Sequence, residues 1–389
     1  MTILRQLARG LLATGALIVT ACSGDPITPA GPVEAPAANL LTGSIDALPS
    51  GGTSNTVMAK AVSPRGWVLG VFYQNGLTVR AQAWSPGPDY VVGTVTDTGS
   101  VYSAADEHGD VTAVAGSLGP VVYVAEYASG GAPYAVAQLP LPPDPGVLGN
   151  WQPGGLNDSH IVVGGGPIGP VVWVPTATGA TTWLDPFTLP LPGFPLGINA
   201  AEAAGVNSSG LIVGTVQELL KRGLTYHAWL WRVEQMNGAW TTTSLGELPW
   251  APGASDQAAS DVNDSGVIVG WVRERGDEHA AFWYPDAVGN YTQPPTVHAV
   301  AQWNATHVNR CGWTVSTLMS GKGRTGGVVA WNGVEVVSLP LLEGSSDAKA
   351  FDINDEGIVA GASIFKAKGR TPTTHMATVW RDFVPPCPP

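Results

Sequence analysis

The chain has 389 residues, of which 44% are hydrophobic and 12% charged, and its formal net charge is −12. The hydrophobic content excludes general disorder, and the negative charge argues against nucleic acid as a partner. The 50 glycines and 33 prolines supply many turns, so we expect an all-β fold of short strands.

The N-terminus has the features of an export signal. Arg5 and Arg9 form a positive segment, and the apolar stretch from Leu11 to Val19 is too short to span a bilayer. The following Val-Thr-Ala-Cys, which ends at Cys22, resembles the lipobox of bacterial lipoproteins. The resemblance implies that residues 1–21 are a lipoprotein signal peptide and that Cys22 becomes lipidated. The alternative is an ordinary secretory signal in which Cys22 happens to lie near the cleavage site.

Residues 22–40 are rich in Pro and Ala and lack apolar periodicity, so we expect a lipidated tether ahead of one folded domain at 41–389. Several acyl chains anchor a protein durably, which makes the membrane a partner through the lipid anchor. In such lipoproteins Ser23 after the cysteine favours the outer membrane over inner-membrane retention. We therefore expect a cell-envelope protein. The sequence does not decide between the periplasmic face and the outer face of the membrane.

The rest of the chain repeats one sequence motif, called the phrase below. Its most complete copy runs from Ala258 to Trp283. Ala259–Val262 is predicted as a strand, Asn263–Gly266 as a turn and Val267–Trp271 as the returning strand. His279–Trp283 is predicted as a third strand.

The same strand-turn-strand phrase occurs seven times. With His160 in the place of a glycine, successive turn positions are 43, 51, 50, 56, 46 and 45 residues apart, which is the spacing of propeller blades. The turn positions are Gly66, Gly109, His160, Gly210, Gly266, Gly312 and Gly357. The fold class predicted here is a seven-bladed β-propeller.

Each third strand ends in an aromatic residue, and the repeated register indicates packing between neighbouring blades. A role of these rings in sugar stacking is the weaker alternative. The set comprises Trp84, Tyr123, Trp173, Trp231, Trp283, Trp331 and Trp380.

A fourth strand follows in most units but not after Trp380, where nine residues remain. The segment Leu41–Pro49 carries the same Leu-Pro ending as the fourth strands elsewhere. We therefore predict that this N-terminal strand pairs with the last unit and closes the ring, which removes exposed sheet edges.

The V-N-x-x-G-x-I-V-G phrase followed by H-A-x-x-W resembles the HAF-type extracellular repeat over residues 41 to 381. Only His227-Ala228 and His279-Ala280 keep the His of that signature. The resemblance implies a propeller-like fold and an extracytoplasmic location, and it supplies no activity.

No motif in the chain points to a metal or a cofactor. The Asp261-x-Asn263-Asp264-x-Gly266 segment resembles a calcium loop, but Val269 stands where such a loop needs a carboxylate. Two G-x-G-x-x-G segments, at residues 164–169 and 321–326, precede strands instead of helices, so both are predicted as hairpin loops. We therefore expect no cofactor, no metal and no assigned catalytic residue.

Two sets of polar residues remain open. His227 and His279 share a register in adjacent units and are expected to cap the starts of their strands. Asp110, Asp261 and Asp352 are candidates to converge on an axial channel, although no acid or base role follows from their spacing.

Cys311 and Cys387 form an even pair in an oxidising compartment, so we predict a disulfide that pins the proline-rich C-terminal tail. The alternative is two free thiols.

Three functions are compatible with the sequence. The favoured one is a membrane-anchored monomeric interaction module that binds a protein or glycan through its variable loops. The second is a polysaccharide-active hydrolase or lyase with carboxylates at the channel, and the third is a structural envelope protein. The absence of a recognisable catalytic constellation favours a non-enzymatic role.

Overall fold

A computed structural model of the protein describes residues 43–49, 56–74, 77–86, 92–96, 101–108, 111–118, 121–127, 133–141, 151–166, 169–176, 182–299, 303–318, 326–366 and 373–388. The chain divides into the units Met1–Leu40 and Leu41–Pro389, and all described residues belong to the second. The predicted signal peptide at 1–21, the lipidation site Cys22 and the tether at 22–40 lie outside the described residues. Within the described part, no helix has the length and apolar character needed to cross a membrane.

The described part is built from strands. Five sheets contain four strands each and follow one another along the chain. Their strands are β6 (Val101–His108), β7 (Val111–Leu118), β8 (Val121–Tyr127) and β9 (Pro133–Gln138); β10 (Gln152–Leu156), β11 (Val162–Gly166), β12 (Gly169–Trp173) and β13 (Phe187–Thr188); β14 (Ile198–Val206), β15 (Leu211–Leu220), β16 (Gly223–Met236) and β17 (Ala239–Glu247); β18 (Ala254–Val262), β19 (Ile268–Glu274), β20 (Asp277–Trp283) and β21 (Thr296–Val297); β22 (Trp303–Val308), β23 (Thr314–Leu318), β24 (Val328–Trp331) and β25 (Val336–Leu339).

A sixth sheet of eight strands joins the two ends of the chain. One half contains β2 (Thr56–Val62), β3 (Val68–Gln74), β4 (Leu77–Trp84) and β5 (Val92–Thr96), and the other contains β26 (Asp347–Ile353), β27 (Val359–Phe365), β28 (Thr374–Arg381) and β1 (Ser44–Ala47). The halves meet at one parallel pair, Thr56 with His375. The described strands form six sheets and not the seven that one sheet for each predicted blade would give, since this pair merges the first and last units.

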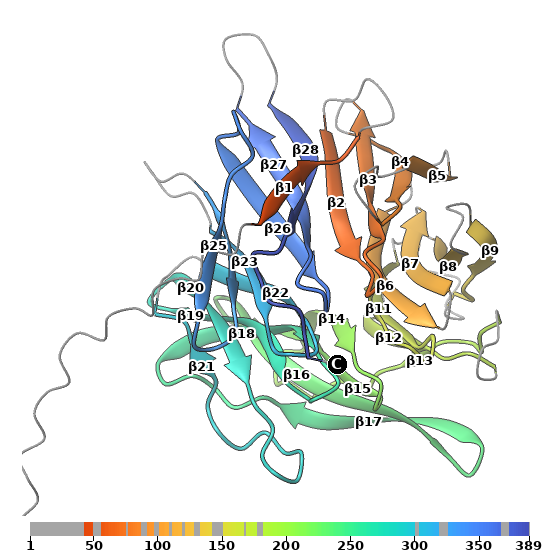
Figure 1. Ribbon diagram of the computed structural model, residues 1–389. Helices are drawn as coiled ribbons and strands as arrows, with labels where there is room; N and C mark the ends of the chain where they lie inside the picture. The colour runs from red at the N-terminus through yellow and green to blue at the C-terminus, as the bar shows by residue number, and fades with distance from the viewer. Residues whose placement is uncertain are drawn as a thin grey trace, which may run out of the picture. The chain divides into compact units, whose positions relative to one another are not determined.

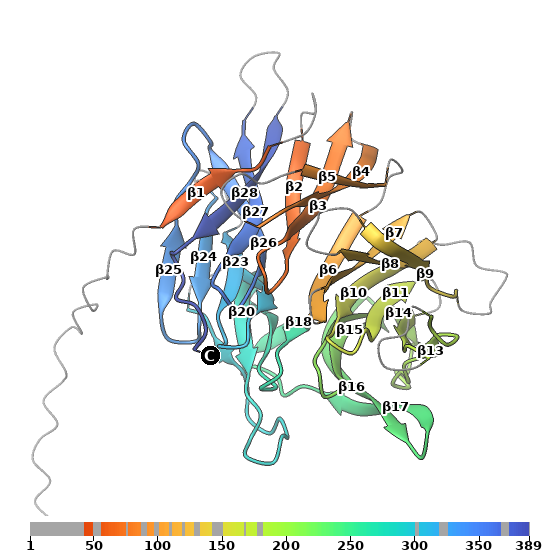
Figure 2. The same cartoon turned by 45° about the vertical axis from the view of Figure 1, so that its right-hand side comes forward.

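The sheets are arranged in a ring. The first strands of successive units contact one another in a closed cycle: β2, β6, β10, β14, β18, β22, β26 and again β2. Figures 1 and 2 show the last strands, in blue, beside the first ones, in orange.

The phrase from Ala258 to Trp283 forms the predicted strands and turn, with longer strands than the apolar residues alone indicate. Gly266 has a φ of 77°, which suits the end of the turn. Gly270 lies so close to the neighbouring strand β18 that a Cβ atom would be 2.0 Å from the carbonyl oxygen of Ala258. His160, which takes the glycine position in its own unit, also has a positive φ, of 56°. The repeated glycines are therefore demanded by backbone geometry.

The tryptophans form the packing between units, as predicted. Trp84, Trp173, Trp231, Trp283 and Trp380 are fully buried, Trp331 nearly so, and the side chain of Tyr123 lies outside the described ones. Five of the indoles donate to the carbonyl of a Leu-Pro proline that ends an outer strand. The pairs are Trp84 with Pro49, Trp173 with Pro140, Trp231 with Pro190, Trp283 with Pro249 and Trp380 with Pro340. Because proline has no N–H, it ends the ladder there and leaves its carbonyl to the next unit.

The predicted N-terminal strand is β1, which pairs antiparallel with β28 from Ser44 with Arg381 to Ala47 with Thr378. Beyond it, the Leu48 N–H donates to the carbonyl of Ala377. Figure 2 shows β1 lying against β28. The strand from the start of the domain therefore completes the sheet at its end.

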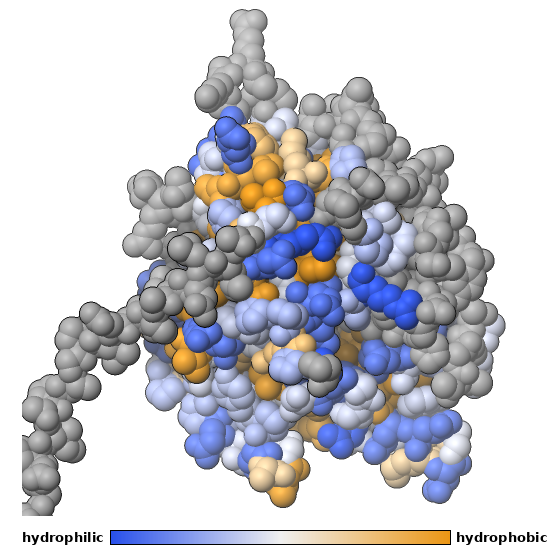
Figure 3. Space-filling model, viewed as in Figure 1, coloured by the Kyte–Doolittle hydropathy of each residue, from blue (hydrophilic) through white to orange (hydrophobic). Residues whose placement is uncertain are grey.

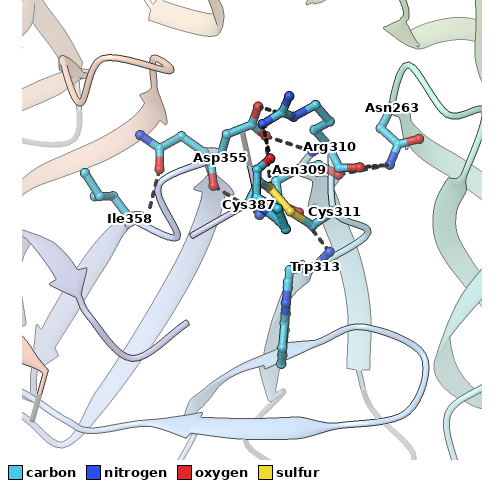
Figure 4. The surroundings of a disulfide bond; sticks show 10 residues. Asn263, Asn309, Arg310, Cys311, Trp313, Asp355, Ile358 and Cys387 are labelled. Atoms are coloured by element: carbon cyan, nitrogen blue, oxygen red, sulfur yellow. Dashed lines mark hydrogen bonds and ion pairs between the residues drawn. A yellow bond between two sulfur atoms is a disulfide. The ribbon is translucent and has the colours of Figure 1, made fainter. Parts of the chain in front are cut away.

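The C-terminal tail is fastened to two turns. Cys311 and Cys387 are joined by a disulfide, with their Cα atoms 5.5 Å apart (Figure 4). The Cys387 N–H donates to the carbonyl of Asp355 at 2.7 Å, and Arg310 donates to that of Pro388 at 2.9 Å. The tail thus links the turn after β22 to the turn after β26.

Candidate functional site

An asparagine at the start of the turns connects neighbouring units. Within its own turn, the Asn263 side-chain oxygen accepts from the Val267 N–H at 2.9 Å. Its amide nitrogen donates to the carbonyl of Asn309 in the next unit, also at 2.9 Å. Asn157, Asn207, Asn309 and Asn354 repeat both bonds.

The last asparagine joins the seventh unit to the first. Asn354 donates to the carbonyl of Ser63, 291 positions earlier in the sequence, at 2.8 Å. The turns of the third to seventh units and of the first are thereby linked in series at one end of the ring.

Two cavities lie along the inner strands, and both are lined by His307 and Gly154. The strand-side cavity has a volume of about 600 Å³ and is bounded by residues of β10, β14, β15, β18 and β22. The turn-side cavity has a volume of about 530 Å³ and is bounded by the asparagine turns. We take the strand-side and turn-side cavities as the candidate site.

A histidine between two aspartates stands where the cavities meet. Nδ1 of His307 lies 3.4 Å from Oδ2 of Asp261 and 3.6 Å from Oδ1 of Asp352. Asp261 also accepts from the Val308 N–H at 2.9 Å, and Asp352 from that of Val62 at 2.7 Å. Each carboxylate therefore holds the next unit as well as the histidine.

The charges of this group stabilise one another. Desolvation opposes a charge on His307, but attraction to Asp352 and the hydrogen bond and charge of Asp261 outweigh it and raise its pKa to about 9. Burial raises the pKa of Asp352, although the charge of His307 and the backbone N–H donors act in the opposite direction. At neutral pH His307 is therefore protonated and lies between the carboxyl groups of Asp261 and Asp352.

The register of the three residues explains why they meet. Asp261, His307 and Asp352 each stand two residues before a turn asparagine, in three successive units. Their strands shift register just before or across this position, and such bulges turn a side chain toward a new direction. At the equivalent Gly205 a Cβ atom would lie 2.6 Å from Oδ1 of Asp261, so only glycine leaves room for the carboxylate.

The wall of the strand-side cavity combines small residues with two aromatic rings. Alanines and glycines of β10, β14 and β18 form much of it. Tyr226 and Trp271 line one side, with ring centroids 5.8 Å apart. Glu202 also lines the cavity, where water reaches it, and desolvation by the surrounding wall raises the pKa of its carboxyl. Gln152 and Gln217 add amide groups.

An arginine braces the aromatic pair. The Arg273 guanidinium carbon lies 5.2 Å from the ring centroid of Trp271 and 5.9 Å from that of Tyr226. Arg273 itself donates to Asp256 at 3.0 Å and to Glu278 at 2.6 Å. The rings are therefore held in place before any ligand arrives.

The histidines of the HAF-like signature do share a register, since His227 pairs with Val216 and His279 with Val272. His227 lies between Glu247 at 2.6 Å and Glu218 at 3.2 Å. Desolvation lowers the His227 pKa, but the two glutamates outweigh it and raise it overall. His279 contacts the carbonyl of His298 at 3.0 Å. Neither histidine lines the two cavities.

Lys60 stands apart from both cavities. Burial and the charge of Lys349 lower its pKa to about 8, and its Nζ lies 3.7 Å from the ring centroid of Phe351. No carboxylate partner is found for it among the contacts of the described residues, and we assign it no role.

The remaining predicted positions divide as follows. Asp261 and Asp352 converge as expected, and Asp110 lies outside the described residues. The glycine segment at 164–169 is a hairpin, with Gly166 paired to Gly169, whereas most of the segment at 321–326 is outside the described part. In the described ranges no group of three or more His, Cys, Asp or Glu residues could hold a metal ion. His307 was not among the predicted site residues, although its place two residues before Asn309, like that of Asp261 before Asn263, is visible in the sequence.

Neither a family model nor a curated protein matches the chain. Among solved structures, the β-propeller domain of the trilobed protease from Pyrococcus furiosus matches with a TM-score of 0.50 and 11% identity, over 84% of this chain and 96% of that one. The fold is a β-propeller. The similarity at this identity concerns the fold alone. That domain has an open velcro topology, whereas in this propeller β1 pairs with β28.

Two further matches have lower scores. The Dos1 propeller gives a TM-score of 0.48 at 8% identity, over 86% of this chain and 95% of that one. Prolyl oligopeptidase B from Galerina marginata gives 0.48 at 8% identity, over 83% of this chain and 51% of that one.

Proposed function

We propose that this protein is a lipid-anchored extracytoplasmic propeller of seven blades that binds a ligand in its strand-side cavity. The observation that carries the proposal is a preformed cavity of about 600 Å³, within the range of about 300–1,000 Å³ common for small-molecule sites. Its aromatic wall is braced by Arg273, so binding requires little rearrangement.

The blade count follows from treating the halves of the eight-stranded sheet as separate blades. Each half has four strands, and only the pair of Thr56 and His375 joins them. Each half also begins with a first strand of the inner cycle, β2 or β26. Seven blades agree with the seven repeats of the sequence.

The proposed location of the protein in the cell envelope is supported by the predicted signal peptide and by the cysteines. The Val-Thr-Ala-Cys ending at Cys22 supports lipidation, and membership in the HAF-type repeats is proposed from the repeated phrase. The disulfide of Cys311 and Cys387 supports an oxidising compartment. The outer membrane is the proposed site of anchoring.

Cleavage of polysaccharide is the second candidate. Asp261 and Asp352 approach the same nitrogen of His307, so their carboxylates lie no more than about 7 Å apart, a spacing that glycosidases use. Both, however, also accept a backbone N–H from the next blade and share one imidazolium. Because these bonds hold blades together, binding is the function that the geometry favours.

Retention from envelope extract tests the proposal. The full chain is used as bait beside Ala200→Trp, which places a large ring in the strand-side cavity from an exposed position. The control Thr243→Trp adds the same ring at an exposed position of β17. We expect a component retained by the unsubstituted chain and the control to be lost with Ala200→Trp. Equal retention by all three, or no retention, would contradict a cavity-binding function.

A further inference from the structure

We propose that the ligand of the strand-side cavity is a neutral saccharide that stacks on Trp271 beside Tyr226. This inference rests on the proposed binding function and adds the chemical class. It is carried by the aromatic pair, by the amides around it and by the charge of the wall.

The rings provide the stacking surface. Trp271 and Tyr226 come from adjacent blades, on β19 and β16, and both line the cavity at intermediate exposure. Their planes are inclined by 57°, so they form two sides of a corner. The apolar C–H face of a sugar ring fits against such a surface, while its hydroxyl groups remain at the edge.

The brace shows that this corner is preformed. The Tyr226 N–H donates to Oδ1 of Asp256 at 3.1 Å, and the other oxygen of that carboxylate accepts from Arg273. One carboxylate therefore fixes the strand that carries Tyr226 and the guanidinium next to Trp271. Such an arrangement lowers the entropy lost on binding.

The polar groups match sugar hydroxyls, which both donate and accept hydrogen bonds. Gln217 lines the cavity and accepts from Asn199 through Oε1 at 3.0 Å, so its NH₂ group remains as a donor. Gln152 and Ser260 line the same space, as does Thr306, whose hydroxyl donates to the carbonyl of Val315 and keeps its acceptor capacity. Amide and hydroxyl groups provide donors and acceptors without a net charge.

The charge of the wall selects against anions. Of the described residues that line the strand-side cavity, none is Lys or Arg, and Glu202 is the one carboxylic acid, while His307 at the end of the cavity lies between Asp261 and Asp352. Phosphate and uronate groups would face Glu202, and the one cationic side chain on the wall, His307, is already paired with Asp261 and Asp352. Alanine and glycine walls also lack the deep apolar pockets that anchor peptide side chains. A neutral saccharide therefore fits the wall better than an acidic glycan or a peptide.

Calorimetric titration of the full chain tests the inference. The probes are the hexasaccharides of β-1,4-glucose, β-1,3-glucose, α-1,4-glucose, β-1,4-xylose and β-1,4-N-acetylglucosamine, with hexagalacturonate and a tryptic digest of casein as comparisons. We expect at least one neutral hexasaccharide to bind. Trp271→Ala and, independently, Gln217→Ala should each weaken that binding by about ten-fold or more.

The control is Tyr284→Ala, which removes an exposed ring that lies outside both cavities and should leave the affinity unchanged. No binding of any neutral hexasaccharide would overturn the inference, as would an affinity unaffected by either cavity variant. Binding of casein peptides or hexagalacturonate alone, lost in Ala200→Trp, would overturn the saccharide class while leaving the proposed binding function in place.

Discussion

The turn asparagines show how one side chain serves two blades. The oxygen of Asn263 accepts from its own turn, and its nitrogen donates to the backbone of the next blade. Asn263 is buried, so removing its amide leaves a backbone carbonyl and an N–H without their partner.

We therefore expect Asn263→Ala to lower the free energy of unfolding by about 2–3 kcal/mol, measured by urea denaturation. Asn332→Ala is the matched control, since Asn332 accepts only from Val334 and Glu335 in its own loop. Its cost should stay below about 1 kcal/mol. Equal losses for the two variants would show that the cross-blade bond contributes nothing.

His307 makes stability depend on pH. Its folded pKa of about 9 lies above the ordinary 6.5, so its contribution is fully present below pH 6.5 and is lost as the pH rises through 9. Because the side chain is 27% exposed, solvent screening reduces that contribution to about 1–2 kcal/mol. Thermal melts from pH 6 to 10 should show His307→Gln less stable than the original chain at pH 6.5, with the difference closing by pH 10. A difference that is constant with pH would disprove this role.

At the scale of elements, the sequence predicts what is local or periodic. Gly266 marks a turn, and Gly270 marks the close approach of two strands. The Leu-Pro endings mark the last bonded residue of an outer strand. These residues alone were enough to predict where the strands lie. The partners across blades could not be predicted, because the Asn263 amide and the Trp283 indole bond residues 46 and 34 positions away. Those contacts depend on the curvature of the ring. The position of His307 in its repeat could be predicted from the sequence. Its two aspartate neighbours could not, because they belong to two other repeats.

The strand β1 is the element whose loss opens the ring. It forms the outer edge of the last sheet, and the following Pro49 accepts from Trp84 of the first blade. Deleting residues 41–50 should therefore lower the melting temperature by about 10 °C or more, because the β1–β28 ladder and the bond from Trp84 to Pro49 are both lost. Circular dichroism melts measure this, with deletion of residues 30–39 in the tether as the control of equal length. An unchanged melt after deleting 41–50 would rule out closure by β1.

At the scale of the whole molecule, the propeller supports the strand-side cavity. The lipidated Cys22 is its proposed attachment to the membrane. The coloured part of the face in Figure 3 is largely hydrophilic, with one group of apolar residues near the top and others scattered below it. We propose that lipid on Cys22 attaches the protein to the membrane.

Cys22→Ala tests this attachment. The variant should move from the membrane pellet to the soluble periplasmic fraction or the medium, because the acyl chains that hold the protein are absent. Carbonate-washed membranes are compared by immunoblot, with Cys387→Ala as a cysteine control that keeps the anchor. Persistence of Cys22→Ala in the washed pellet would contradict lipid anchoring.

Hydrogen–deuterium exchange tests the central claim, that the strand-side cavity binds the ligand, most directly. The full chain is measured alone and with the component it retains from envelope extract. The account predicts slower exchange in β14, β18 and β19, whose residues line the cavity, and unchanged exchange in the outer strands β17 and β25. Protection confined to the outer strands, with the cavity strands unchanged, would contradict it.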